Sequence, residues 1–197
     1  MAQPSVTAAE RPILLGAFNG GFKVAAHAGG VEIGGHILSP LVPGMASLVI
    51  DANGLAQVGV WGQGFPAPGE TVVSVRQNLP PLLIDSGPSP SIAAVGSWGS
   101  TLHGVAFQAR SALGEDASGD LIYAASMGAF PADLASALLS AGATVAMELD
   151  INPEWVQADV APAPGAALMA VVPGQNEPSD RYLNGWTRDF ITVDAPA

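Results

Sequence analysis

The chain has 197 residues, of which 49% are hydrophobic and only 12% are charged, a balance that excludes an intrinsically disordered protein and allows one substantial core. Its 17 acidic and 6 basic residues give a net charge of −11, so we exclude nucleic acid as a main partner. Cysteine is absent, which excludes disulfides, thiolate metal sites and a cysteine nucleophile.

No basic and then apolar leader precedes the first predicted strand, and no run reaches the roughly 18 consecutive apolar residues of a membrane helix. We therefore expect a single domain over residues 1–197 that does not insert into a membrane. The short polar lead before Ile13 is also the start that a segment excised from a longer envelope protein would have. The oligomeric state is left open.

The first predicted strand covers residues 12–18 and is followed by Asn19-Gly20-Gly21. Asn-Gly is a strong signal for a hairpin turn. We therefore expect the chain to reverse there and to resume as a strand over residues 22–26.

Two further hairpins are predicted from alternating apolar residues on both sides of a polar turn. One has its arms at residues 45–50 and 55–61, and the other at residues 110–114 and 120–126. Shorter strands are expected at residues 71–76, 82–84, 166–172 and 188–193.

A helix is predicted over residues 131–141. Pro131 suits the first turn of a helix, Asp133 suits its positive end, and a stripe of leucines runs to Gly142. The chain then reads as a strand over residues 143–151. Many hairpin strands with few helices indicate an α+β fold that is mainly antiparallel sheet, with the helices packed on it.

The strand at residues 143–151 carries the first candidates for chemistry. Glu148 and Asp150 are two residues apart, so side-chain alternation places both on one face, opposite Met147 and Leu149. Because acids are rarely fully buried unless paired, we expect this face to meet water, a partner group or a substrate. A solvated acidic face of an edge strand is the alternative.

Only six residues are basic, so each one is a candidate for contacting an anion. Arg110 lies on a predicted strand face, where a guanidinium can grip phosphate or carboxylate through paired donors. The alternative is a structural ion pair with an acid such as Asp150. Arg76 allows the same two interpretations.

Glycine-rich loops supply the other candidates for contacting a substrate. Asn19-Gly20-Gly21 offers a carboxamide and close backbone N–H groups, although glycine more often serves only the turn itself. Asp85 ends a strand, Trp98 either stacks on a sugar ring or fills a packing gap, and His103 adds an imidazole.

Motifs typical of serine nucleophiles, zinc proteases and nucleotide-binding loops are missing from the sequence. The three histidines at positions 27, 36 and 103 lack metal-site spacing. We expect neither a metal nor another cofactor. A calcium ion held by Asp150, Asn152 and loop carbonyls is the alternative, because calcium prefers oxygen ligands.

Three segments, in this order, resemble the phosphodiester glycosidase family. They are Asn19-Gly20-Gly21-Phe22, Arg110-Ser111-Ala112-Leu113-Gly114, and the strand Ala146-Met147-Glu148-Leu149-Asp150 after the helix. The agreement extends over about residues 13 to 152, and the tail through residues 181–190 looks like a bacterial branch that is often secreted or membrane-anchored.

The resemblance implies a hydrolase that cleaves the glycosidic bond of a sugar-1-phosphodiester. Its partner would be a carbohydrate or sugar phosphate, on a cell-envelope or exopolysaccharide glycan, and its location extracellular or in the envelope. Asn19, Gly20 and Gly21 would line the site, Arg110 would hold the phosphate, and Asp150 would be a catalytic carboxylate.

The sequence departs from the family pattern at two places. Ala125-Ser126 replaces an Asp-Gly, and Ile151-Asn152-Pro153-Glu154 replaces a Gly-Gly-Gly-Ser loop. We hypothesise that Glu148 supplies the missing acid, because residues i and i+2 on a strand lie about 6.5–7 Å apart. That separation leans toward an inverting glycosidase.

The departures favour an alternative hypothesis, a non-catalytic glycan-binding or structural envelope module of the same fold. An anionic substrate would need a local positive field in this acidic protein. The sequence assigns that field to Arg76 and Arg110.

Overall fold

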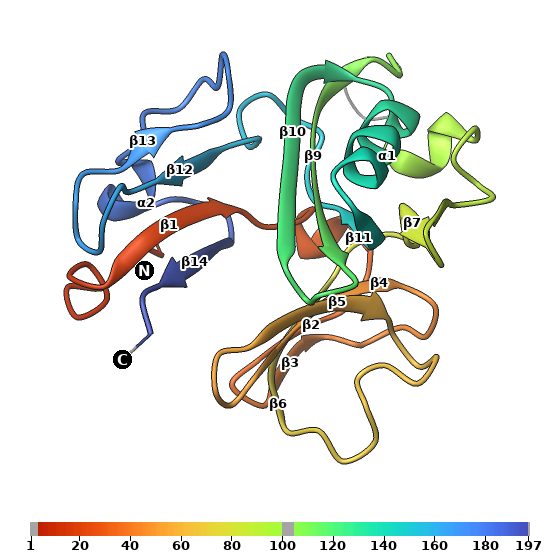
Figure 1. Ribbon diagram of the computed structural model, residues 1–197, viewed down its shortest axis with the longest axis horizontal. Helices are drawn as coiled ribbons and strands as arrows, with labels where there is room; N and C mark the ends of the chain where they lie inside the picture. The colour runs from red at the N-terminus through yellow and green to blue at the C-terminus, as the bar shows by residue number, and fades with distance from the viewer. Residues whose placement is uncertain (1–3, 100–104, 197) are drawn as a thin grey trace.

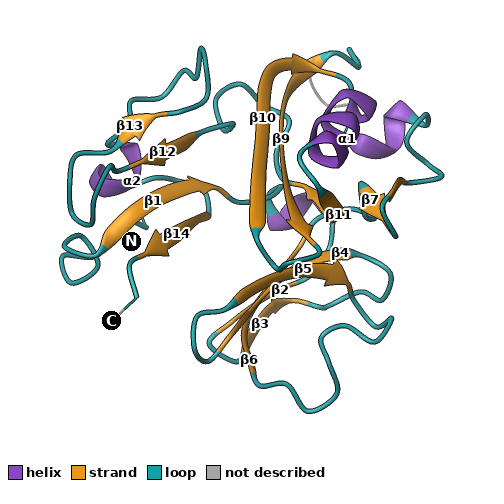
Figure 2. Cartoon of the chain, in the orientation of Figure 1, coloured by secondary structure: helices purple, strands orange, loops and turns teal. Residues whose placement is uncertain are grey.

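The computed structural model describes residues 4–99 and 105–196, and in these ranges the chain forms three β-sheets with few helices (Figure 1). Its fourteen strands pair with one another only in the antiparallel sense among the residues described. Figure 2 shows how little of the chain is helical. The predicted α+β fold, dominated by antiparallel sheet, is confirmed.

The helices are α1 (Pro131–Ser140) and α2 (Arg181–Asn184), with the short 3-10 helices η1 (Val24–Ala26) and η2 (Val95–Trp98). The helix predicted over residues 131–141 is confirmed as α1. In the described ranges, no helix combines the length and hydropathy that crossing a bilayer requires.

The first and last strands of the chain lie side by side in a four-stranded sheet, here named the terminal sheet. Its order is β13-β12-β1-β14. The bounds are β1 (Leu14–Asn19), β12 (Ala158–Val160), β13 (Met169–Ala170) and β14 (Phe190–Asp194). The first and last predicted strands are confirmed, whereas the strand expected over residues 166–172 is only two residues long.

The Asn19-Gly20-Gly21 turn does not form the predicted hairpin. After β1 the chain leaves the terminal sheet, passes through η1 and enters a different sheet at Val31. Hairpin turns at Asn-Gly need positive φ, and neither glycine has it. The N–H of Gly20 instead donates to the carbonyl of Asp189 at 3.0 Å, which ties the turn to the chain just before β14.

A second sheet, the hairpin sheet, has the order β3-β2-β6-β4-β5. The bounds are β2 (Val31–Ile33), β3 (His36–Ser39), β4 (Ala46–Asp51), β5 (Ala56–Val60) and β6 (Val72–Gln77). The hairpin predicted at residues 45–61 is confirmed as β4 and β5. The β2–β3 hairpin was not predicted, although Gly34 and Gly35 both have the positive φ that such a turn needs.

The central sheet has the order β10-β9-β11-β7-β8. The bounds are β7 (Leu83–Ile84), β8 (Gly87–Pro88), β9 (Gln108–Asp116), β10 (Leu121–Ala129) and β11 (Ala143–Glu148). The long β9–β10 hairpin confirms the third prediction. As a strand, β11 ends at Glu148, but Ser111 N donates to the Asp150 carbonyl at 2.9 Å, so the next residues stay against β9.

One buried apolar cluster joins the three sheets. Its members include Phe18 of β1, Leu48 of β4, Leu113 of β9 and Met147 of β11. A separate cluster lies between α1 and the central sheet. The end of β11 is therefore fixed at the point where all three sheets meet.

Candidate functional site

The carboxylate of Asp150 lies just beyond β11, and its residue is only 4% exposed. Its Oδ2 accepts a hydrogen bond from Arg188 Nη2 at 2.6 Å, and its Oδ1 accepts one from the N–H of Ile151 at 2.8 Å. Burial raises the pKa of Asp150 to about 6, because lost hydration outweighs the attraction of the Arg188 cation.

The Gly20-Gly21 turn is pressed against the same arginine. The carbonyl of Gly21 accepts a hydrogen bond from Arg188 Nη2 at 2.8 Å. A Cβ on Gly20 would collide with the Asp189 carboxylate, and one on Gly21 would lie 2.9 Å from Asn78 Oδ1. Glycine is needed here for close approach, not for a left-handed backbone.

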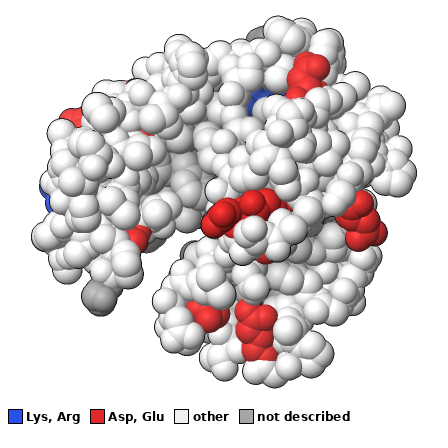
Figure 3. All heavy atoms as spheres, viewed as in Figure 1, with Lys and Arg blue, Asp and Glu red and all other residues white. Residues whose placement is uncertain are grey.

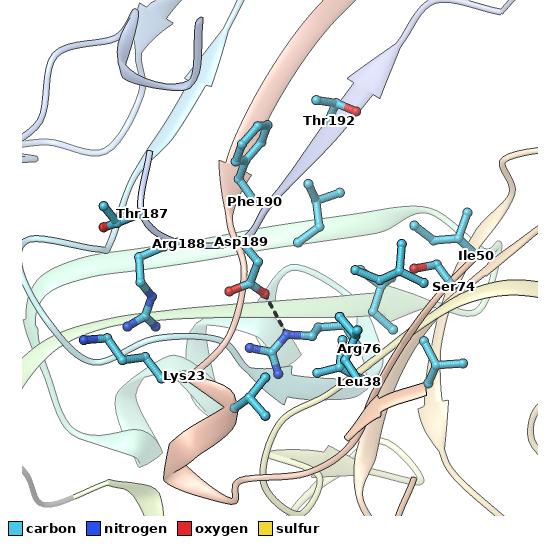
Figure 4. A pocket seen from close by; sticks show the side chains of 16 residues that line it. Lys23, Leu38, Ile50, Ser74, Arg76, Thr187, Arg188, Asp189, Phe190 and Thr192 are labelled. Atoms are coloured by element: carbon cyan, nitrogen blue, oxygen red, sulfur yellow. Dashed lines mark hydrogen bonds and ion pairs between the residues drawn. The ribbon is translucent and has the colours of Figure 1, made fainter. Parts of the chain in front are cut away.

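A second ion pair lies on the other side of this turn. Arg76 Nε donates to Asp189 Oδ2 at 2.7 Å, and its guanidinium also donates to the carbonyls of Phe22 and Gln77. Figure 4 shows the Asp189 carboxylate aimed at Arg76, with Arg188 and Lys23 on its other side. The two Arg–Asp pairs thus enclose the glycine turn.

A cavity of about 460 Å³ opens between the terminal sheet and the hairpin sheet, where the surface in Figure 3 is hollowed. Three of the six basic residues line it, namely Lys23, Arg76 and Arg188. Asp189 is the one acid among the described residues that line it. In a chain of net charge −11, such a concentration of cations favours an anionic ligand.

Trp155 connects two of these cations. The guanidinium carbon of Arg188 lies 5.0 Å from the centre of its ring, and Lys23 Nζ lies 5.9 Å from it. Both distances allow a cation–π contact. Trp186 packs edge-on against Trp155, with ring centres 5.2 Å apart.

Four residues of this site were not predicted from the sequence, namely Lys23, Trp155, Arg188 and Asp189. The one signal for Arg188 and Lys23 was the scarcity of basic residues, which makes every one of them a candidate. Nothing local in the sequence pairs Arg188 with Asp150, because the two are 38 positions apart and flank strands of different sheets, Asp150 after β11 and Arg188 before β14.

Arg110 and Glu148 form a separate ion pair inside the central sheet. Both side chains have no exposed surface, and Arg110 Nη1 lies 2.5 Å from Glu148 Oε1. The other guanidinium hydrogen bonds go to the carbonyls of Ala106, Trp98 and Ala129. The structural ion pair that sequence analysis kept as the alternative is present, with Glu148 as the partner in place of Asp150.

The Glu148 carboxyl group shares no contact with the cavity. Its Oε2 has no hydrogen-bond partner among the described residues. Burial raises its pKa to about 7, since desolvation outweighs the nearby Arg110 cation. Glu148 and Asp150 therefore face different arginines, although both were expected on one open face.

Asn19 is buried, and its side-chain amide makes hydrogen bonds to other residues of the protein. Its Nδ2 donates to Ser111 Oγ at 2.9 Å, and its Oδ1 accepts from Tyr123 Oη at 2.7 Å. Ser111 Oγ in turn accepts from the N–H of Asp150 at 3.2 Å. Asn19 is thus placed to hold the backbone of Asp150 in position.

Of the predicted site residues that the structure describes, Arg76 alone lines this cavity. Asp150 and Gly21 are linked to it through their hydrogen bonds with Arg188. Asp85 is exposed, has a φ of 51°, and lines a second cavity of about 440 Å³ between the hairpin and central sheets. Trp98 is fully buried and its Nε1 donates to the Ser91 carbonyl at 3.0 Å, so it fills the core below α1. His103 lies outside the described residues.

A metal site would need a cluster of suitable side chains. Over residues 4–99 and 105–196, no group of three or more His, Asp or Glu side chains could hold a metal ion. Asp150 is directed at Arg188, and Asn152 Oδ1 accepts from the N–H of Glu154 at 3.0 Å.

No protein-family model matches this chain, and no curated protein matches it. Among solved structures, it is similar to the catalytic domain of zebrafish N-acetylglucosamine-1-phosphodiester alpha-N-acetylglucosaminidase, auto-inhibited by its pro-peptide. The TM-score is 0.62 at 17% identity, over 98% of this chain and 67% of that one.

A hypothetical protein from Synechocystis is a weaker match, with a TM-score of 0.48 at 14% identity, over 90% of this chain and 53% of that chain. The first similarity shows that this chain shares the fold of a glycosidase catalytic domain.

Proposed function

We propose that this chain is a hydrolase that cleaves the glycosidic bond of a sugar-1-phosphodiester in the cavity between the terminal and hairpin sheets. One observation carries the proposal: the guanidinium of Arg188 lines the cavity and also binds the buried carboxylate of Asp150. The fold shared with the catalytic domain of a phosphodiester glycosidase supports this reaction class.

The cations of the cavity suit the phosphate of such a substrate. The guanidinium groups of Arg76 and Arg188 both line the cavity, and guanidinium is a cation whose planar geometry suits phosphate oxygens. Lys23 makes no ion pair with any described residue, so its charge is available to a ligand. Phosphate oxygens would compete with Asp150 for the Arg188 guanidinium and release Oδ2 of that carboxylate.

The bond that breaks joins the anomeric carbon to a phosphate oxygen. The oxygen of a water molecule forms a new bond to the anomeric carbon, and Asp150 accepts the proton that this water loses. The products are a free sugar and a phosphate monoester. The developing charge on the departing phosphate is stabilised by Arg76, Arg188 and Lys23, so a separate acid is not required.

Glu148 and Arg110 have a supporting role in this proposal. Their buried pair fixes the end of β11 against β9, and Asn19 and Ser111 hold the backbone of Asp150 from the other side. We further propose a cell-envelope or exopolysaccharide glycan as the substrate and an extracellular or envelope location, as the family resemblance implies.

A non-catalytic module that binds glycan phosphates is the second candidate. The observation in its favour is that the Asp150 side chain is only 6% exposed and both of its oxygens accept hydrogen bonds. A binding module would keep this ion pair closed with ligand present.

Release of reducing sugar from a panel of sugar-1-phosphodiesters tests the proposal. We expect turnover by the parent, a loss of about a hundredfold to ten-thousandfold in kcat for Asp150→Asn, and weaker binding for Arg188→Gln. Arg11→Gln removes the same charge at an exposed arginine outside the cavity and should match the parent. Saturable binding of these compounds without turnover would establish the binding module instead.

A further inference from the structure

The cavity has two chemically different parts. Its charged part holds the two Arg–Asp pairs and Lys23 described above. Its wall on the hairpin sheet is mainly apolar, with Val31, Ile33, Leu38, Leu48 and Ile50 as lining residues. In Figure 4, Ile50 lies on the far side of Arg76 from Lys23 and Arg188.

The strand register arranges these side chains in two rows. The first row across β2, β6 and β4 is Val31, Arg76 and Leu48. The second row is Ile33, Ser74 and Ile50, two residues farther along each strand, so it lies about 6.5–7 Å from the first. A group attached to a phosphate at Arg76 would therefore meet an almost wholly apolar surface.

The outer part of this wall is unusually open to water. Ile33 is 52% exposed and Leu38 is 61% exposed. They continue the apolar surface from the buried Leu48 toward the cavity mouth. Covering such side chains with an aliphatic group is favourable, because it removes apolar area from water.

Resting on the proposed function, we infer that the substrate is an amphiphile: a sugar-1-phosphodiester whose second ester group is a single aliphatic chain. The phosphate binds at Arg76, Arg188 and Lys23, and the aliphatic chain lies along Ile33, Leu38 and Ile50. The cations select an anionic headgroup, and the net charge of −11 opposes a second copy of this chain as the occupant.

Calorimetric binding of octyl phosphate and ethyl phosphate, both below micelle-forming concentrations, tests the inference without relying on catalysis. The parent should bind octyl phosphate at least about tenfold more tightly, because six more methylenes leave water. Octyl glucoside, which has the same chain without the charge, should bind at least about tenfold more weakly than octyl phosphate.

Three serine variants locate the chain-binding surface. Ile33→Ser and Leu38→Ser should each reduce the octyl preference severalfold and leave ethyl phosphate binding unchanged. Ile37→Ser is the matched control, because Ile37 is 64% exposed on the same strand as Leu38 and does not line the cavity. All three side chains are more than half exposed, so the variants should fold.

Equal affinity for octyl and ethyl phosphate overturns the inference, as does an Ile37→Ser effect equal to that of Leu38→Ser. Tight octyl binding together with no hydrolysis of any sugar-1-phosphodiester would retain the amphiphile site and overturn the proposed function. Hydrolysis of octyl and glyceryl phosphodiesters of one sugar with equal kcat/KM would retain the proposed function and overturn the amphiphile site.

Discussion

The Asp150–Arg188 pair determines how the proposed site responds to pH. Asp150 must be ionised to accept a proton from water, and burial raises its pKa to about 6. The value of kcat/KM should therefore rise with pH, reach half of its maximum at a pH of about 6 and level off above that. The carboxylate was predictable from sequence as an acid at a strand end, but its partner was not, because Arg188 reaches it only through the tertiary fold.

Removing the cation should move this pH profile in a defined direction. Arg188 lowers the pKa of Asp150 against the effect of burial, so in Arg188→Gln the pKa of Asp150 should rise. The ascending limb of kcat/KM should shift to higher pH by about one unit or more. An unchanged profile, or a shift to lower pH, would show that Asp150 does not determine the ascending limb. Arg11→Gln is the control for the loss of one positive charge, and its profile should match that of the parent.

The glycine turn gives a second prediction at the residue scale. In Gly20→Ala, the new methyl group would collide with the Asp189 carboxylate, so the free energy of unfolding should fall by about 1–3 kcal/mol. Gly96→Ala is the matched control, because a Cβ there meets no atom within 4 Å. Equal denaturation midpoints for the two variants would contradict the close packing of the turn.

At the scale of elements, local patterns explain which parts of the fold could be predicted. The hairpins β4–β5 and β9–β10 and the helix α1 carry their own alternation and turn signals, and they form as expected. The Asn19-Gly20-Gly21 turn failed as a hairpin because its conformation is set by contacts with Asp189 and Arg188, which are distant in sequence.

The buried Arg110–Glu148 pair joins β9 to the end of β11. Removing one partner leaves an uncompensated buried group, so Arg110→Met should lower the free energy of unfolding by about 3–5 kcal/mol. The double variant Arg110→Met/Glu148→Leu should recover most of that loss. If urea denaturation shows that the losses caused by Arg110→Met and by Glu148→Leu simply add in the double variant, the two side chains do not act as a pair.

At the scale of the whole molecule, the cavity could not be predicted from sequence. One wall comes from β2, β4 and β6 and the other from β14, and no local pattern reports that these strands face each other. From the acidic composition we predicted that an anionic substrate needs a local cluster of cations, made by Arg76 and Arg110. The cavity instead brings Arg76 together with Lys23 and Arg188.

Buried acids should make the whole protein less stable as pH rises. Burial raises the pKa of Asp159 to about 6 from 3.8, so the folded state binds this proton more tightly than the unfolded state. The resulting stabilisation is fully present below pH 3.8 and is lost as pH rises through 6. Glu148 and Asp150, with pKa values also raised by burial, add in the same direction.

Urea denaturation of the parent between pH 4 and pH 7 should show this decline, and Asp159→Asn should flatten it. Repeating both series in 0.5 M NaCl separates the effect from surface repulsion, which salt screens. A parent whose free energy of unfolding increases over this interval would contradict the assignment.

In the proposed reaction, the bond between the sugar and the phosphate is broken on the sugar side. Hydrolysis of the best substrate of the panel in ¹⁸O-labelled water, followed by mass spectrometry of both products, measures this directly. We expect the label to enter the sugar and the phosphate monoester to carry none. Label in the phosphate, which would indicate cleavage of the phosphorus–oxygen bond, would contradict it.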